Sequence, residues 1–562
     1  MMESSLEPLG GRARARPLAL ALLLAGVAMA FADSSIVVLA LPDLLRQFDV
    51  SIAGVSWVIT AFNLSLAVVA LIYSRARFAS LSPARATQLG ALVFLAASLG
   101  CAASTSVWLL VGLRVLQGAG AALLVVGALP LIQSLASSTR RGAALWAGAG
   151  VLGAAIGPAF GGALTDVFSW RAIFLAQVPI AALALVAALY PPARNSELAP
   201  FEQTEGPRRH AVSLALGLAS AALVGLLFLA VLELIDVWRL SPLAAAGVVS
   251  VIPIATYLAQ RLAARVESAA TTGAILLAAG LAGMGFLPAR NVVWVIAALA
   301  IAGAGLGLLL PGLTQRVLSD AGPSTAGAAH TVWIRHVGLV VGILLLTPLL
   351  TTDLSSAAQT AKLRGISAVL DAPVSIATKA RLAVDVAPVI AQAPRKQLPD
   401  FENTLRPEHD PALTRIGREL DQIVEATITR GFRRSYLLAA LLGLLALVPL
   451  AVLRSSDVRR RSPRAAVIAL AIATALIGAE LARGAQAFGA QPRLQPACVS
   501  RPSAPTPGAD GQAQKLALEG LDFVACRLHT NREQLLLNTA AWASKARADL
   551  NTWTHHLHLP FG

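Results

Sequence analysis

Charged residues are scarce in this chain of 562 residues: they make up 13% of it, whereas 56% of the residues are hydrophobic. A soluble domain carries about 25% charged residues, so this composition excludes an ordinary soluble protein and is typical of a membrane protein. Lysine is especially rare, since only five of the 45 basic residues are lysines. The net charge of +15 does not indicate a nucleic-acid partner, because the arginines gather between apolar segments, where they orient a membrane protein.

Several chemical motifs are missing as well. No glycine and lysine spacing of a nucleotide-binding loop occurs, so we expect an ion gradient and not ATP as the energy source. Nothing resembles a catalytic triad or a credible zinc site. We therefore expect no enzyme activity, no cofactor and no metal.

Long apolar segments recur along most of the chain. A helix needs about 20 apolar residues to cross a bilayer, and length and polar interruptions predict thirteen spans. They cover residues 17–41, 53–74, 86–105, 107–135, 142–165, 171–190, 211–236, 241–263, 270–287, 292–314, 326–350, 434–454 and 464–484. The chain is therefore predicted to be an all-α polytopic membrane protein that contacts membrane lipid.

The arginines predict the orientation of these spans. If the amino terminus is cytoplasmic, the cytoplasmic segments hold nineteen arginines, and the short outer loops and helix ends hold four: Arg46, Arg171, Arg239 and Arg290. Because cytoplasmic loops are enriched in basic residues, we expect a multi-pass protein of the plasma (cell inner) membrane with its carboxyl terminus outside. A secretory signal cleaved after Ala30 is the alternative interpretation of the first span.

The spans divide the chain into regions. These are a six-helix bundle (1–190), a cytoplasmic linker (191–210), five helices of a second bundle (211–351), an extracytoplasmic loop domain (352–433), the twelfth helix (434–454), a basic cytoplasmic loop (455–463), a thirteenth helix (464–484) and a small extracytoplasmic helical tail (485–562). The tail holds Cys498 and Cys526, which can form a disulfide in an oxidising exterior or remain two unrelated thiols. The sequence does not identify a partner protein for the tail.

Two opposite charges interrupt the apolar spans. Asp33 lies about eight residues from the outer end of the first predicted span, and Arg114 lies about seven from that of the fourth. At about 1.5 Å per residue the two side chains reach nearly the same depth. A charge within the membrane needs a partner, so we expect Asp33 and Arg114 to pair. A purely structural pair between helices is the alternative to a functional one.

Small residues mark the fifth span. Gly153, Gly157, Pro158, Gly161 and Gly162 lie in one helix, in the stretch "GVLGAAIGPAFGGAL". Small residues four apart allow helix backbones to approach closely, and a proline bends a helix. Glycine spacing alone often reflects a static contact between two helices. Its combination with proline favours a contact between helices that move against each other.

Together these motifs resemble the major facilitator superfamily, and within it the drug:proton antiporters. The resemblance rests on Asp33 with the following "SSIVVLALPDL", on "WVITAFNL" and "RVLQGAGAA", and on "GAAIGPAFGG" followed by "WRAIF". It implies two six-helix bundles around a central cavity that opens alternately to each side. It also implies that Asp33 and Arg114 take part in proton coupling and that Gly157, Pro158, Gly161 and Gly162 form the antiporter motif.

The sequence departs from that family pattern in one loop. Relatives carry a glycine, aspartate and arginine motif between the second and third helices, but no acidic residue occurs here from Ser51 to Thr165. The remaining "YSRARFASLSPAR" is basic and has no acidic partner. The usual latch of the inner gate is therefore in doubt.

Polar residues elsewhere in the spans are candidates for the cavity. We expect Asn63, Gln117, Arg335 and His336 to line it, with Arg335 or His336 binding an anionic group or transferring a proton. In the alternative interpretation Arg335 is a structural anchor, and Glu233 and Asp236, three residues apart, lie at the interface.

We therefore expect a secondary transporter that exports small amphipathic or drug-like molecules and uses protons as the coupling ion. A metabolite importer and a non-transporting membrane receptor or scaffold are the alternatives. A small-molecule substrate is the expected partner in the first two cases.

Overall fold

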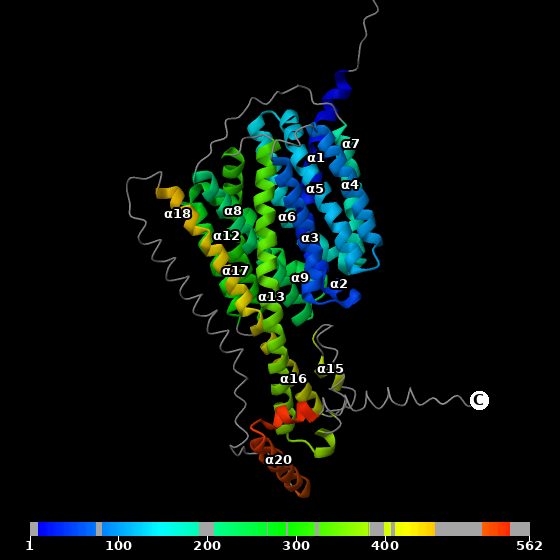
Figure 1. Ribbon diagram of the computed structural model, residues 1–562, viewed down its shortest axis with the longest axis vertical. Helices are drawn as coiled ribbons and strands as arrows, with labels where there is room; N and C mark the ends of the chain where they lie inside the picture. The colour runs from blue at the N-terminus through cyan, green and yellow to red at the C-terminus, as the bar shows by residue number, and fades with distance from the viewer. Residues whose placement is uncertain are drawn as a thin grey trace, which may run out of the picture. The chain divides into compact units, whose positions relative to one another are not determined.

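The computed structural model describes most of the chain as helices (Figure 1). The described residues are 9–74, 81–189, 207–266, 268–287, 290–320, 325–379, 382, 398, 400–405, 411–455 and 508–539. Among them, eleven helices are long and apolar enough to cross a membrane, and Ala269–Gly285 is apolar but shorter. Twelve of the thirteen predicted spans thus correspond to helices. The predicted thirteenth helix, 464–484, lies outside the described residues.

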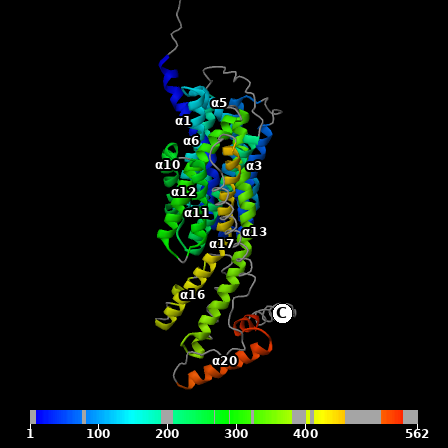
Figure 2. The same ribbon diagram turned by 90° about the vertical axis from the view of Figure 1, so that its left-hand side faces the viewer.

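The chain divides into two compact units. Unit 1 comprises Met1–Asp353 and Phe432–Ala482, and unit 2 comprises Leu354–Gly431 and Arg483–Gly562. The apolar helices of unit 1 run side by side in both Figure 1 and Figure 2.

The first half of unit 1 contains six long helices and one short one. They are α1 (Leu9–Ile36), α2 (Leu41–Phe48), α3 (Ile52–Ser74), α4 (Pro83–Ala103), α5 (Val107–Leu135), α6 (Thr139–Val167) and α7 (Trp170–Ala188). Serine hydroxyls cap several of them, since a side-chain oxygen satisfies a free N–H group of the first turn. Ser82, Ser106 and Ser138 accept in this way from the third residue beyond them, at the starts of α4, α5 and α6.

The second half contains the remaining apolar helices. They are α8 (Pro207–Leu232), the π-helical segment Glu233–Val237, α9 (Pro242–Val249), α10 (Val251–Leu262), α11 (Ala269–Gly285), α12 (Val292–Asp320), α13 (Thr325–Asp371), α17 (Arg433–Leu445) and α18 (Leu447–Ser455). The first residues of the predicted linker 191–210 lie outside the described residues, and its last four belong to α8.

The two halves repeat the same close helix packing. In the first half, a Cβ atom on Gly90 of α4 would lie 2.3 Å from the Leu124 nitrogen of α5. In the second half, a Cβ atom on Gly305 of α12 would lie 2.3 Å from the Leu277 nitrogen of α11. Only glycine permits such approaches of backbone to backbone. Equivalent helix pairs therefore meet through glycine in both halves, as expected for internal repeats.

Three predicted spans differ in detail. The first one breaks after Ile36 into the 3-10 turn Val37–Ala40 and then α2, where Pro42 lacks an N–H group. The eighth one breaks at Ser250, three residues before Pro253. The eleventh helix was predicted to end at 350 but continues to Asp371. Hydropathy marks the membrane boundary and not the helix end, and beyond the first serines and threonines the continuation carries good helix formers such as Ala357, Lys362 and Leu363.

Unit 2 contains the end of α13 together with α15 (Phe401–Leu405), α16 (Pro411–Gly431) and α20 (Ala509–Arg527). A small apolar core of its own joins α13, α15 and α16. The first twenty residues of the extracytoplasmic loop domain predicted at 352–433 prolong α13. A cavity of about 540 Å³ lies in this unit, between α13 and α16. None of the predicted site residues lines it.

Candidate functional site

A buried ion pair lies at the centre of the first half. Asp33, three residues before the end of α1, pairs with Arg114 of α5, and both side chains are 0% exposed. The sequence predicted this pairing from equal depth, and the structure confirms it. Two charges removed from water need each other and further hydrogen bonds to offset their lost hydration.

Amide side chains supply those further bonds. Gln177 of α7 donates through Nε2 to Oδ1 of Asp33 at 2.7 Å. Gln117 donates to Oε1 of Gln177 at 2.8 Å and accepts from Nη1 of Arg114 at 2.7 Å. Ser98 of α4 accepts from the Gln117 amide at 2.8 Å. Four helices thus contribute to one buried network.

The remaining faces of the Arg114 guanidinium contact α3. Nε donates to the Val58 carbonyl at 3.0 Å, and the guanidinium carbon lies 4.1 Å from the centre of the Phe62 ring. Nη2 is buried without a hydrogen-bond partner among the described residues. The arginine is therefore fixed in position, yet it keeps one donor for a further acceptor.

Close packing of α5 on α3 sets this geometry. A Cβ atom on Gly118 would lie 2.3 Å from the Phe62 carbonyl oxygen. Because glycine has no Cβ, α5 approaches α3 closely enough for Arg114, one turn earlier, to reach Val58 and Phe62.

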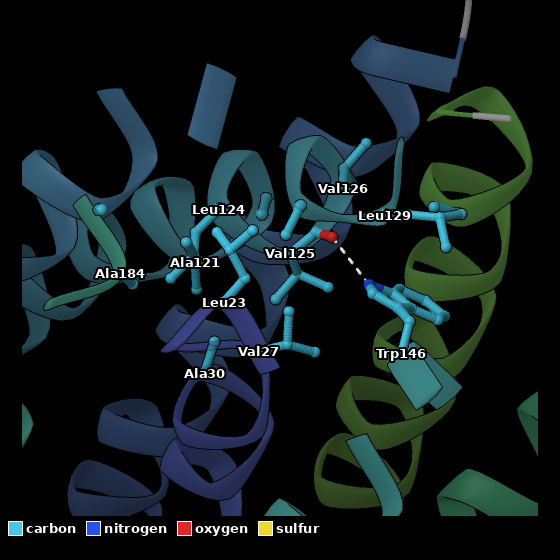
Figure 3. Packing of buried hydrophobic residues seen from close by; sticks show 14 of the residues in the cluster. Leu23, Val27, Ala30, Ala121, Leu124, Val125, Val126, Leu129, Trp146 and Ala184 are labelled. Atoms are coloured by element: carbon cyan, nitrogen blue, oxygen red, sulfur yellow. Dashed lines mark hydrogen bonds between the residues drawn. The ribbon is translucent and has the colours of Figure 1, made fainter. Parts of the chain in front are cut away.

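An apolar cluster fills the space beside the network, on the amino-terminal side of Asp33 along α1. Figure 3 shows its members on α1, α5, α6 and α7: Leu23, Val27, Ala30, Ala121, Leu124, Val125, Val126, Leu129, Trp146 and Ala184. Trp146 donates through its indole nitrogen to the Val125 carbonyl at 2.9 Å, which is the dashed line in Figure 3. This cluster keeps water away from one side of the ion pair, and a charge pair interacts more strongly where water is excluded.

The glycines of the predicted antiporter motif face α1. A Cβ atom would lie 1.9 Å from the Ala28 carbonyl oxygen at Gly153, 2.1 Å from the Ser35 hydroxyl at Gly157 and 2.3 Å from the Ile36 carbonyl at Gly161. Gly162 instead faces the second half of the unit, where its Cβ atom would lie 2.6 Å from the Pro242 carbonyl. Pro158 lies inside α6 between these contacts. This helix therefore touches both halves through glycine.

Two of the predicted cavity residues belong to the buried network or its edge. Gln117 bridges Arg114 and Gln177, as described above. Asn63 accepts from the Ser34 hydroxyl at 2.9 Å, one residue from Asp33, and is itself 0% exposed. Any part these two side chains play in a substrate cavity would require a change in this packing.

Arg335 and His336 lie on α13 and face the first half of unit 1. The Arg335 guanidinium lies 4.9 Å from the Phe31 ring of α1, and the His336 ring lies 5.8 Å from it. His336 is buried and donates through Nδ1 to the Val332 carbonyl at 2.8 Å. Arg335 is partly exposed, and no hydrogen bond or ion pair joins it to the described residues. Of the four candidates, Arg335 is thus the one with an unused charge.

The acidic residues at the end of α8 differ from the interfacial interpretation. Glu233 is 1% exposed and accepts from the Tyr436 hydroxyl at 2.8 Å, whereas Asp236 is partly exposed and lies 3.6 Å from Arg46 of α2. Both residues belong to the π-helical segment Glu233–Val237. The wider turn changes the angular spacing, so residues three apart do not share one face. Glu233 is thus buried within the protein, whereas its neighbour Asp236 is partly exposed.

Two of the three cysteines lie among the described residues. Cys526 is disulfide-bonded, and Cys101 is buried and free. The predicted partner Cys498 lies outside the described residues. No group of three histidine, cysteine or acidic side chains that could hold a metal ion occurs in the part of the chain that the structure describes.

Sequence reasoning missed Gln177 and Ser98. Gln177 is the one polar residue besides Arg171 in a helix of nineteen, immediately before Val178 and Pro179. The argument that drew attention to Gln117, a polar side chain among apolar neighbours, applies equally to Gln177. Ser98 carries no such signal, because a serine can bond its own helix, and it does bond the Phe94 carbonyl.

Comparison with known proteins places these features in a family. The family description "Major Facilitator Superfamily" matches residues 23–345, more than half of the chain. Solved structures agree in fold: a bacterial homologue of the human lysosomal transporter Spinster, in an inward-facing and occupied conformation, matches 77% of this chain and 97% of its own with a TM-score of 0.53 and 15% identity.

Curated relatives share shorter segments. The uncharacterized MFS-type transporter Rv1250 of Mycobacterium tuberculosis is 36% identical over 172 residues, which are 30% of this chain and 29% of the relative. The multidrug resistance protein Stp of the same species is 36% identical over 164 residues, 28% of this chain and 30% of the relative. This chain thus spans about three tenths of the length of these two relatives.

One further relative is matched over more of its length. The methylenomycin A resistance protein of Streptomyces coelicolor is 26% identical over 397 residues, which are 57% of this chain and 83% of the relative. The family match, the apolar helices and the repeated halves agree with one another. This chain is a multi-pass membrane protein and belongs to the major facilitator superfamily.

Proposed function

We propose that this protein exports small amphipathic molecules across the cell membrane in exchange for protons. The observation that carries the proposal is the fully buried pair of Asp33 and Arg114 with its amide network. The names of relatives, which include multidrug resistance and drug efflux proteins, support the same direction of transport.

Protonation gives the ion pair two states. With Asp33 ionised, the pair holds α1 against α5. With Asp33 neutral, Arg114 loses its counter-ion, and an uncompensated buried charge costs about 3–5 kcal/mol. Such a difference shifts a conformational equilibrium roughly a hundredfold or more, which is enough to favour a second arrangement of the helices.

The glycine contacts of α6 provide a place for that rearrangement. This helix contacts α1 at three and five residues from Asp33, through Ile36 and Ala28, and contacts the second half through Pro242. Movement of α1 against α6 would therefore change the contact between the halves. Alternating access then follows from two packings of the same helices, between which proton and substrate select.

The substrate is proposed to bind between the halves, near Arg335 and Phe31. An aromatic ring and a cation without an ionic partner suit an amphipathic molecule with a flat or anionic part. Asn63, Gln117 and His336 would join this cavity when the network opens. In this proposal the amino terminus is cytoplasmic and the carboxyl terminus extracytoplasmic.

The proposal is tested by dye transport in inverted membrane vesicles with an imposed proton gradient. Wild-type protein, Asp33→Asn and the control Asp166→Asn are compared at matched expression, with ethidium and carboxyfluorescein as cationic and anionic probes. Asp166 is an exposed carboxylate near the end of α6. We expect gradient-dependent transport of at least one dye by the wild type and the control, and markedly weaker gradient-dependent transport by Asp33→Asn. Wild-type vesicles that transport neither dye would contradict the proposal.

A further inference from the structure

A second buried carboxylate lies in the other half of unit 1. Glu233 opens the π-helical segment Glu233–Val237 at the end of α8, with an exposed fraction of 1%. One carboxylate oxygen, Oε2, accepts from the hydroxyl of Tyr436 on α17 at 2.8 Å. The other oxygen, Oε1, is buried without a hydrogen-bond partner among the described residues. An ionised carboxylate in this position would leave an unpaired buried charge.

The charged groups around Glu233 do not neutralise it. Asp236, in the same segment, pairs with Arg46, and Arg46 also pairs with Asp43 of α2. On α17, Arg434 pairs with Asp353 at 2.7 Å, and the Arg433 guanidinium lies 4.5 Å from the Phe286 ring.

The remaining neighbours are apolar. Helix α9, which also packs on this segment, contains no titratable residue, and the residues of α8 before Glu233 are Phe228 to Leu232. Tyr436 is thus the titratable side chain bonded to the carboxyl group. An isolated charge costs far more to bury than a neutral polar group, so Glu233 is most stable here with a proton bound.

The local backbone is unusual at the same point. π-helical turns are rare and are found frequently at functional sites. This turn carries the buried carboxyl at its first residue and, at Asp236, an ion pair to Arg46 in the first half of the unit. A change of the turn that brought Glu233 into contact with water would therefore alter a contact between the two halves.

We propose that Glu233 is a second proton-binding residue of the transport cycle, so that each half of unit 1 contributes one carboxyl group. This inference rests on the proposed function, since it assigns a further proton to the same exchange. Glu233 takes up the proton on its carboxylate as the turn closes and releases it when the turn opens to water. Two protons, one on Asp33 and one on Glu233, then move for each substrate molecule.

Proton stoichiometry is the decisive measurement. Full-length protein is reconstituted into liposomes with the membrane potential clamped to zero, and the steady ratio of ethidium across the membrane is measured at a proton gradient of about one pH unit. Each coupled proton contributes about 1.4 kcal/mol per pH unit, which is about tenfold in that ratio. We expect the ratio for Glu233→Gln to be about tenfold below that of the wild type. This ratio depends on stoichiometry and not on rate, so a variant that is merely slower leaves it unchanged.

Two further variants serve as matched controls. Glu233→Asp keeps a carboxyl group and should keep the wild-type ratio. Asp166→Asn removes the exposed carboxylate near the end of α6, and it too should keep the ratio. Equal ratios for the wild type and Glu233→Gln would overturn the proposal. Tyr436 can still donate to the glutamine amide oxygen, so Glu233→Gln is expected to fold.

A spectroscopic readout separates this inference from the proposed function. Infrared spectra of the purified proteins at neutral pH report protonated carboxyl groups directly. If the wild type establishes no concentration ratio of dye across the membrane, the proposed function is wrong. The infrared band of protonated carboxyl groups then tests by itself whether Glu233 binds a proton. A band that is weaker in Glu233→Gln supports proton binding there, whereas identical spectra overturn it.

Discussion

At the scale of single residues, the network around Asp33 holds two charges away from water, which costs free energy, and surrounds them with closely placed partners. Asp33 and Arg114 are both 0% exposed, and each has a partner from another helix. Such a pair adds little net stability compared with apolar packing, but removal of one member leaves a charge without compensation. The proposed function accounts for this cost, because it gives the pair a role in a process that changes its charge.

This view predicts a strongly non-additive pair of substitutions. Arg114→Gln leaves Asp33 buried with its charge uncompensated, and we expect the free energy of unfolding to fall by about 3 kcal/mol. The double variant Asp33→Asn, Arg114→Gln removes both charges and should recover most of that loss, with a coupling of about 2 kcal/mol. Thermal unfolding in detergent, followed by tryptophan fluorescence, ranks the stabilities of the two single variants and the double variant. A double variant as unstable as the sum of the single ones would argue against charge compensation.

The sequence predicted the ionic part of this site but not its amides. Opposite charges in apolar helices are rare and must be paired, so equal depth along two helices sufficed for Asp33 and Arg114. Gln177 is neutral and can be satisfied in many ways, and its contact with Asp33 depends on how α7 turns against α1. Glu233 and Asp236 were expected to share one face of a regular helix, whereas a π-helical segment occurs there.

At the scale of helices, glycine sets the distance between α6 and α1. The backbones approach so closely at Gly153 that a Cβ atom would lie 1.9 Å from the Ala28 carbonyl oxygen. By contrast, a Cβ atom on Gly148 of the same helix would meet nothing within 4 Å. The two glycines therefore form a matched pair, one in a tight contact and one in open space.

We predict that Gly153→Ala destabilises the protein by about 1–3 kcal/mol, because the new methyl group must push α6 away from α1. Gly148→Ala should be neutral or slightly stabilising, since alanine favours a helix over glycine by about 1 kcal/mol. Apparent melting temperatures and dye transport of the two variants provide the measurement. If both variants behave alike, the close approach at Gly153 has no energetic consequence.

Helix ends were harder to predict than helix positions. The eleventh span was placed correctly, but α13 continues for some twenty residues beyond its predicted end. Hydropathy reports where a helix leaves the membrane, and it carries no information on where a polar continuation stops. The breaks before Leu41 and at Ser250 accompany Pro42 and Pro253, which have no N–H group to donate.

At the scale of the whole molecule, the two halves of unit 1 share packing but not charge. Gly338 of α13 takes the place that Gly153 has in the first half: its Cβ atom would lie 2.1 Å from the Gly217 carbonyl oxygen of α8. The buried ion pair, however, lies in the first half, and the buried Glu233 lies in the second. Similar glycine contacts between helices thus occur in both halves, beside different polar groups.

This repetition predicts that Gly338→Ala destabilises the protein to a similar extent as Gly153→Ala, by about 1–3 kcal/mol. Gly312→Ala is the control in the second half, because a Cβ atom there would meet nothing within 4 Å. The same melting experiment covers both substitutions. A Gly338→Ala variant as stable as Gly312→Ala would show that the contact between α8 and α13 is not close-packed in the same way.

The central claim is that Asp33 couples proton movement to transport. The most direct test compares two modes of dye movement in proteoliposomes: exchange of dye at equal pH on both sides, which needs no proton coupling, and accumulation of dye driven by a proton gradient. We predict that Asp33→Asn keeps exchange but reaches a gradient-driven accumulation about tenfold below that of the wild type at one pH unit, because the proton carried by Asp33 no longer moves with the dye. An Asp33→Asn variant that accumulates dye as well as the wild type would contradict the account.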